Sequence, residues 1–552
     1  MPQLPAECQS TNSITCSSPQ VPSRRETGWN NLKNHLHHRQ PAGYDEKVRK
    51  IISHLLKKPI WLIIAFALIL RLPLLTGSFW LDEAAQAIES SRPLAEQLDI
   101  VADFQPPLLH YLIHFATYFS YQEWWLRMWG ALIPGIITIW ASYQIGKKLF
   151  SEKVGLWTAL LLATSSFHIF YSQELRPYSL PAMWGSLSTL ALITKPFNNW
   201  KFILFSLAGL YSSYLYPFLL ITQIIVLWFR QRSIAKLLQT TLLITIGYLP
   251  WLPMFFQQLK AGQSLRLEIP GWETVVSIPQ FKALLLVPLK FIFGVLNLEL
   301  TWPFLFAIFI FGFLCIKLFW QNPKHLWINL LNNFGNLPKL WRKLDSRNQM
   351  ALLLFLPLIT AWLISFVVPV IQPKRVLFAL PFFYLIFTSL LAWKKIDKES
   401  NKNLHFLLYF FLFINLWSTV SYWHETTLQR ENWRELKQTI VERFPASSTL
   451  VIMSFDGAFA PWRWYEPEYP TLVTGRRHVQ DVISLKETLK PTFDKEYVLV
   501  FDYLRTLTDP QDKILETLTD FGFTGRGVID YPGIGFVRIY ARTHSAISTL
   551  KR

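Results

Sequence analysis

Long apolar segments recur along this chain, and they constrain its fold more than any other feature. Residues 59–77, 124–146, 351–370 and 405–423 are each long enough to cross the roughly 30 Å hydrocarbon layer of a membrane as a helix. A helix satisfies its own backbone hydrogen-bonding groups, which lipid cannot do. Hydrophobic residues make up 51% of the chain and charged residues 16%, whereas a soluble domain carries about 25% charged residues. The chain is therefore predicted to be a polytopic α-helical membrane protein.

The formal net charge of +18 does not indicate nucleic-acid binding, because the cations lie in short links between apolar segments. Such links are typical of cytoplasmic loops. They are Lys57-Lys58, Lys147-Lys148, Arg230 to Arg232, Lys339 to Arg347 and Lys394-Lys395. Alternating the segments across the membrane by this rule predicts about 11 spans in a plasma membrane, with a cytoplasmic N-terminus and an extracytoplasmic C-terminus.

The charge pattern divides the chain into three parts. Residues 1–58 are polar and are predicted to form a disordered cytoplasmic tail. Its HLHH sequence at 35–38 is interpreted as solvated, because nothing nearby completes a metal-coordination set. Residues 59–423 form the predicted transmembrane domain. In 424–552, strand-like runs at 448–455, 497–503 and 535–542 alternate with helix-like runs, which predicts an extracytoplasmic α/β domain.

The first outer loop, 77–123, contains the strongest chemical signal. Asp82 and Glu83 stand side by side where the first apolar segment ends, and Asp82 is a suitable N-cap for a following helix. An ionised carboxylate at the boundary of lipid and water suits a general base; the alternative is a solvated helix cap. Later in the loop, the segment 106–119 is short for a span, and we expect a juxtamembrane or re-entrant helix. If it did span, Lys147 and Lys148 would lie outside.

Three further groups of polar residues fall on the predicted outer side. Gln105 and His110 flank a Pro-Pro pair, and both are expected to contact an acceptor or line a pocket; for His110 a hydrogen bond within the fold is the alternative. The pair of His110 and His114, one helical turn apart, is not expected to bind metal. The second group consists of Glu174, Arg176 and Tyr178, which lie between two apolar segments. Ionisable residues at such a place are usually functional; an exposed ion pair in a turn is the alternative.

Lys374 and Arg375 form the last group, two cations on the outer side against the general trend. Such cations need an anionic partner, and a phosphate suits the forked Arg side chain; a lipid headgroup is the alternative. Together, the four groups combine acid-base residues with phosphate-binding residues on one side of the membrane. That combination suits an enzyme that handles a membrane-embedded, phosphate-linked donor.

The order of several motifs resembles glycosyltransferase family 39, whose relatives include protein O-mannosyltransferases and the aminoarabinose transferases of lipid A. These motifs are WLDEAAQA, QPPLLHYL, KKLFSEKVG, FHIFYSQELRPYSL and PKRVLFALP. The resemblance covers 59–230 well and 350–445 more loosely, and ENWREL at 431–436 is similar to the segment that opens the outer domain of bacterial members. It implies a GT-C fold and transfer of a sugar from a polyprenyl-phosphate donor, with inversion at the anomeric carbon.

The resemblance also implies roles for individual residues. Asp82 corresponds to the family's catalytic base and Glu83 to the neighbouring acid, while Glu174 and Arg176 correspond to its second outer loop. Glu174, Arg176 and Tyr178 are expected to bind the donor together with Lys374 and Arg375. Arg375 corresponds to an arginine that meets the donor phosphate, although here Val-Leu-Phe follows where many members have an aromatic residue directly after the arginine.

The sequence therefore predicts a membrane glycosyltransferase that uses a lipid-linked sugar and an acceptor on a lipid, glycan or protein. A flippase of lipid-linked sugars is the second hypothesis, but the expected internal repeat is not recognisable. A non-catalytic scaffold that presents the C-terminal domain is the third. No cofactor or metal-ligand set is evident in the sequence, and a divalent metal is left open. The sequence does not indicate the oligomeric state.

Overall fold

The computed structural model describes residues 58–542, with gaps at 232, 269–277, 298–301, 303–304, 307, 314–344, 393–397, 456, 466–467 and 476–481. The predicted tail, its HLHH sequence and most of the basic loop at 339–347 lie outside the described residues. From Pro59 onward the chain forms one compact unit.

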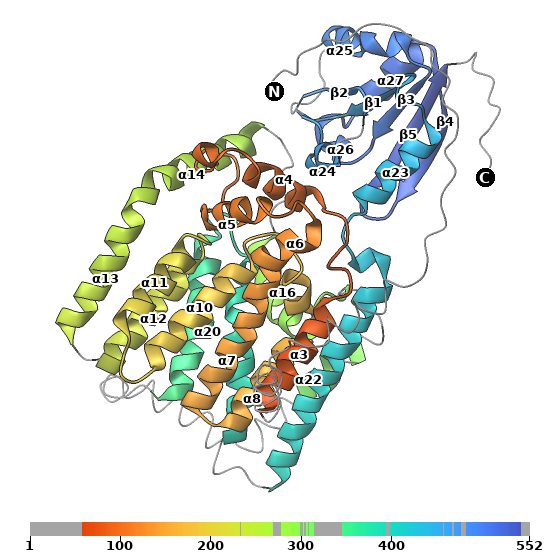
Figure 1. Cartoon of the computed structure of the whole chain (residues 1–552). Helices are drawn as coiled ribbons and strands as arrows, with labels where there is room; N and C mark the ends of the chain where they lie inside the picture. Colours follow the sequence, from red (N-terminus) through yellow and green to blue (C-terminus); the bar gives the residue numbers. More distant parts are fainter. Residues whose placement is uncertain are drawn as a thin grey trace, which may run out of the picture. The chain divides into compact units, whose positions relative to one another are not determined.

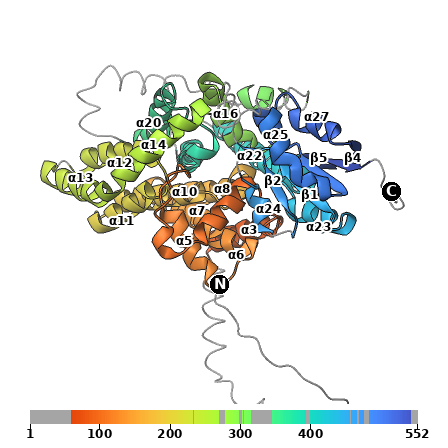
Figure 2. The same cartoon turned by 90° about the horizontal axis from the view of Figure 1, so that it is seen from above.

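A bundle of apolar helices occupies the first part of that unit (Figure 1). Its helices are α3 (Pro59–Arg71), α7 (Ile133–Leu149), α8 (Glu152–Thr164), α9 (Ser166–Tyr171), α10 (Ser179–Ile193), α11 (Asn199–Leu210), α12 (Tyr216–Gln231), α13 (Ile234–Tyr248), α14 (Leu252–Glu268), α16 (Gln280–Phe293), α20 (Ser346–Ile364), α21 (Leu380–Ser389) and α22 (Lys398–His424). Helix α7 packs on both α8 and α10, and α8 packs on α3 and α21. Seen from above, α7, α8 and α10 lie between α11–α13 on one side and α22 on the other (Figure 2).

Two glycines allow the tight α7–α8 hairpin. A Cβ placed on Gly146 would lie 2.8 Å from the Cα of Gly155 and 3.2 Å from the Leu385 side chain. Because protein interiors are close-packed, even one added carbon here would have to displace a helix.

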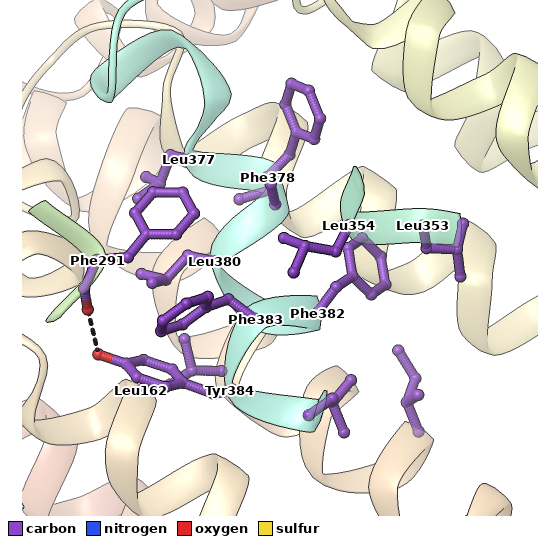
Figure 3. Close-up of a cluster of buried hydrophobic side chains, with 14 of the residues drawn as sticks. Leu162, Phe291, Leu353, Leu354, Leu377, Phe378, Leu380, Phe382, Phe383 and Tyr384 are labelled. Carbon is purple, nitrogen blue, oxygen red and sulfur yellow. Dashed lines mark hydrogen bonds between the residues drawn. The ribbon is translucent and has the colours of Figure 1, made fainter. Parts of the chain in front are cut away.

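Helix α21 lies in the centre of the hydrophobic core, and Figure 3 shows its surroundings. Phe382, Phe383 and Tyr384 are all buried, and α20 contributes Leu353 and Leu354 to the same cluster. The Tyr384 hydroxyl donates a hydrogen bond to the carbonyl of Phe291, 3.1 Å away, at the end of α16. A buried tyrosine hydroxyl needs such a partner, so this bond ties α16 to the bundle.

Four stretches among the described residues are long and apolar enough to cross a membrane: Ile234–Ser264, Ser346–Ile364, Lys374–Ala392 and Asn401–His424. Shorter apolar helices cover Pro59–Arg71, Leu108–Thr117 and Ser179–Ile193. These observations support a helical membrane protein, while the total of about 11 spans stays a prediction.

The first outer loop contains α4 (Leu81–Ser90), α5 (Leu108–Thr117) and α6 (Glu123–Arg127). Helix α5 packs against α4, and its 10 residues are too few to cross a bilayer, which agrees with the preference for a juxtamembrane or re-entrant helix.

A five-stranded mixed sheet follows the bundle. Its strands are β1 (Thr449–Met453), β2 (Thr471–Val473), β3 (Tyr497–Phe501), β4 (Phe523–Tyr531) and β5 (Gly535–Arg542), in the order β2-β1-β3-β5-β4. Strand β1 is parallel to β2 and β3, whereas β5 is antiparallel to β3 and β4. Alternate residues of β1 face two separate cores: Val451 and Met453 pack with α23 (Trp433–Arg443), and Leu450 and Ile452 with α25 (Val482–Leu489) and α27 (Lys513–Asp520). Helices therefore cover both faces of the sheet.

Candidate active site

Helix α4 begins at Leu81, and the N-cap residue is Trp80, whose side chain makes no capping hydrogen bond. The prediction that Asp82 caps this helix is therefore wrong. The cap comes from far along the chain, because the Leu81 N–H donates to the Glu431 carboxylate at 3.3 Å. Asp82 instead lies in the first turn, where the helix dipole favours an ionised carboxylate. Its side chain is 36% exposed, so the carboxylate is accessible from solvent.

Arg176 links Asp82 to the rest of the site. Its Nε lies 3.9 Å from the Asp82 carboxylate, and its Nη1 lies 3.7 Å from the Asp103 carboxylate. Burial alone would lower the pKa of Arg176, but the two carboxylates more than compensate, and the pKa is raised. Arg176 is therefore a fixed cation beside Asp82.

Glu83 has a different environment from that of its neighbour. It is fully buried, and both of its oxygens accept hydrogen bonds from Arg127, at 2.8 and 2.5 Å. The Leu175 N–H donates to it as well, at 2.7 Å. Burial would raise the pKa of Glu83, but the charge and hydrogen bonds of Arg127 lower it overall. This geometry fits a residue that holds α4 in place.

Glu174 also lies in a buried ion pair. Its carboxylate is 3.4 Å from the Nη2 of Arg430, which also donates to the Phe170 carbonyl at 2.7 Å. Burial raises the pKa of Glu174, and Arg430 opposes that effect. Arg430 further approaches Glu83 to 3.9 Å, so one cation joins two acids from different parts of the sequence.

The predicted phosphate-binding residues lie close to α4. The Lys374 ammonium is 5.8 Å from the ring centre of Trp80 and 5.6 Å from that of Tyr178, both within cation–π range. Arg375 donates to the carbonyls of Pro369 and Val370, both at 3.3 Å. Lys374 thus lies against Trp80, the residue directly before α4.

Gln105 and His110 join a polar cluster behind Asp82. His110 is fully buried, and its Nε2 lies 2.5 Å from the Asp103 carboxylate. The Gln105 amide contacts Asp103, the Gln86 carbonyl oxygen at 2.5 Å and His110 at 3.1 Å. Burial, and then the nearby Asp103 carboxylate, raise the pKa of Glu89 to about 7.

Glu431 is a site residue that the sequence reasoning missed. Besides Leu81, it accepts hydrogen bonds from the Trp433 indole at 2.6 Å and the Tyr503 hydroxyl at 2.8 Å. Burial is the largest cause that raises its pKa, to about 7, and the Asp82 charge adds to it. Glu431 therefore connects the sheet region directly to the start of α4.

Arg127 and Arg430 were missed as well. A sequence signal existed for Arg127, because it interrupts the apolar run WWLRMWG, and a charge in such a run usually has a buried partner. Arg430 stands directly before the ENWREL segment, and Glu431 is its first residue. Nothing in the sequence pairs Arg430 with Glu174 or Glu431 with Leu81, because these partners lie more than 250 residues earlier.

A cavity of about 230 Å³ lies on the Glu83 side of this network. Its lining residues are Leu74, Gly77, Ser78, Arg127, Tyr422, Gln429, Arg430, Glu431, Asn432 and Arg434. Three of its arginines are already engaged by acids: Arg127 by Glu83, Arg430 by Glu174, and Arg434 by Glu123.

No protein-family model and no curated protein matches the sequence. Among solved structures, the chain is similar to ArnT from Cupriavidus metallidurans bound to undecaprenyl phosphate, with 11% identity over 88% of this chain and 98% of that chain and a TM-score of 0.49. It is similar to the Archaeoglobus fulgidus oligosaccharyltransferase AglB in complex with an inhibitory peptide and a dolichol-phosphate (11% identity, 88% and 74% coverage, TM-score 0.43). It is also similar to the mycobacterial arabinofuranosyltransferase AftD (12% identity, 87% and 39% coverage, TM-score 0.45). With TM-scores below 0.5, these likenesses by themselves establish neither the fold nor the function of this chain.

Proposed function

We propose that this chain is a membrane glycosyltransferase of the GT-C type, related to family 39, which transfers a sugar from a polyprenyl-phosphate donor to an acceptor at the outer face of the membrane. The observation that carries the proposal is the gathering of Asp82, Arg176 and Lys374 around the start of α4. These residues come from three predicted outer segments that are far apart in the sequence.

In the proposed reaction, Asp82 removes the proton from an acceptor hydroxyl or amine as that group attacks C1 of the sugar. The bond between C1 and the phosphate oxygen breaks, and polyprenyl phosphate leaves with the electron pair. Attack from the face opposite the phosphate inverts the configuration at C1. Lys374 and Arg375 stabilise the charge that grows on the leaving phosphate, an electrostatic effect that often dominates catalysis.

The remaining predicted residues have supporting roles in this proposal. Arg176 orients Asp82, and Glu83 fixes α4 through Arg127. Glu174 holds the second outer segment through Arg430, and Tyr178 packs on the Lys374 ammonium. Gln105 and His110 lie in the polar cluster behind the base.

The test is transfer of labelled sugar by the purified chain from a panel of polyprenyl-phosphate donors, with polyprenyl phosphate measured as the second product. We expect both products from the wild type. If no donor yields either product, while vesicles containing the chain move labelled lipid between leaflets, the flippase hypothesis replaces the transferase. If neither activity appears, the scaffold hypothesis is favoured.

A further inference from the structure

Glu89, Asp103 and His110 bring three potential metal ligands together within the first outer loop. One ligand atom from each lies within 4.8 Å of the other two. Glu89 comes from the last turns of α4, Asp103 from the loop, and His110 from α5, so no short spacing in the sequence identifies this set. The pair of His110 and His114 does not form the site, since His114 bonds elsewhere, to the Ser90 carbonyl.

Two buried oxygens at this cluster have no hydrogen-bond partner among the described residues. One is the Oε2 of Glu89, and the other is the Oε1 of Gln105, a side chain that is only 4% exposed. The Gln105 nitrogen, by contrast, approaches Asp103, Gln86 and His110 with only two hydrogens to share. A buried polar atom without a partner costs about 1–3 kcal/mol. If the Gln105 and Gln86 amides both turn by 180°, the Gln105 oxygen accepts from the Gln86 nitrogen and faces His110 and Asp103. A cation between this oxygen and the Asp103 carboxylate would satisfy both.

The backbone conformation and the charges at the cluster also favour a bound cation. Phe104, between Asp103 and Gln105, has a φ of 54°, in the left-handed region that bulky residues rarely adopt. This conformation lets both neighbours turn toward His110. The cluster carries two carboxylates, those of Glu89 and Asp103. Asp103 forms an ion pair with Arg176 at 3.7 Å, and Arg176 also pairs with Asp82.

We propose that Glu89, Asp103 and His110 bind one divalent transition-metal ion, with the Gln105 oxygen as a fourth ligand. An imidazole nitrogen with carboxylate and amide oxygens suits Zn²⁺ or Mn²⁺, whereas Mg²⁺ and Ca²⁺ prefer sites made of oxygen alone. The bound ion fixes the loop between α4 and α5. It also neutralises Asp103, which leaves Asp82 as the remaining anionic partner of Arg176.

The test is Zn²⁺ binding to the full-length, tag-free chain in detergent, measured by equilibrium dialysis and elemental analysis. The background variant replaces His35, His37 and His38 with alanine and Cys8 and Cys16 with serine, so that the histidines and cysteines of the tail cannot contribute. Glu89→Gln and Asp103→Asn remove ligands with little change in shape, and Glu96→Gln is the matched control, an exposed acid of the same loop.

We expect one Zn²⁺ per chain in the background and Glu96→Gln proteins, and binding at least tenfold weaker in Glu89→Gln and Asp103→Asn, since even outer-shell changes cost about 10–100-fold. Co²⁺ bound at the same site should give a visible absorption band that Glu89→Gln removes. Equal Zn²⁺ binding in all four proteins, or none in the background protein, would overturn the proposal. This readout does not depend on sugar transfer.

Discussion

Glu431 is predicted to make the stability of the protein depend on pH, and Glu431→Gln should remove that dependence. Burial, with a contribution from Asp82, raises the pKa of Glu431 from 4.5 to about 7 in the folded protein. Between these values the folded chain binds a proton at Glu431 that the unfolded chain has released. Proton binding at Glu431 therefore stabilises the folded state fully below pH 4.5, and this stabilisation is lost as the pH rises through 7.

The size of the effect follows from the shift. Each pKa unit corresponds to about 1.36 kcal/mol, so a shift of this size corresponds to up to about 3 kcal/mol between pH 4.5 and pH 8. In Glu431→Gln the single amide oxygen can still accept from the Leu81 N–H and the Trp433 indole, which share one carboxylate oxygen. The amide nitrogen can donate to the Tyr503 hydroxyl, which contacts the other carboxylate oxygen. The variant should consequently be more stable than wild type at pH 8 and no more stable than wild type at pH 5.

The assay is the midpoint of thermal unfolding in detergent, followed by tryptophan fluorescence at intervals from pH 5 to pH 8. Glu442→Gln is the matched control, because Glu442 is an exposed acid on α23, and its curve should follow that of the wild type. If the difference between Glu431→Gln and wild type stays constant across this range, the inferred titration of Glu431 is refuted.

Three further predictions concern the network, the donor phosphate and the bundle. Arg127→Gln removes the cation that bonds both oxygens of the buried Glu83 and should cost about 3–5 kcal/mol; an unfolding midpoint equal to that of wild type would contradict this. Lys374→Met should lower kcat of sugar transfer about 100-fold, as loss of a charge-stabilising group does, with an unchanged unfolding midpoint; unchanged kcat would remove Lys374 from the proposed mechanism. Gly146→Val should cost about 1–3 kcal/mol by overpacking α7 against α8, and a midpoint at or above that of wild type would show that the hairpin can spread.

Local pattern and composition were sufficient to predict the helical membrane character and the positions of several strands. The runs at 448–455, 497–503 and 535–542 lie where β1, β3 and β5 occur, because strand alternation depends on neighbouring residues. The short helix at 106–119 followed from its length alone.

The partners of the site residues could not be predicted in the same way. Asp82 was expected to cap α4, but the capping oxygen belongs to Glu431, 350 residues after Leu81. The burial of Glu83 likewise depends on Arg127 from α6 and on Arg430 from the loop that precedes α23. Interactions of this kind arise from tertiary packing, and a single sequence contains no periodic signal for them.

The most direct test of the central claim is the release of polyprenyl phosphate from a sugar-linked donor by three purified proteins: wild type, Asp82→Asn and Asp99→Asn. Asp99 is an exposed acid in the same outer loop and provides the matched control. We predict release by the wild type and by Asp99→Asn, and almost none by Asp82→Asn with an unfolding midpoint equal to that of wild type. Equal release by all three proteins would contradict the assignment of Asp82 as the catalytic base.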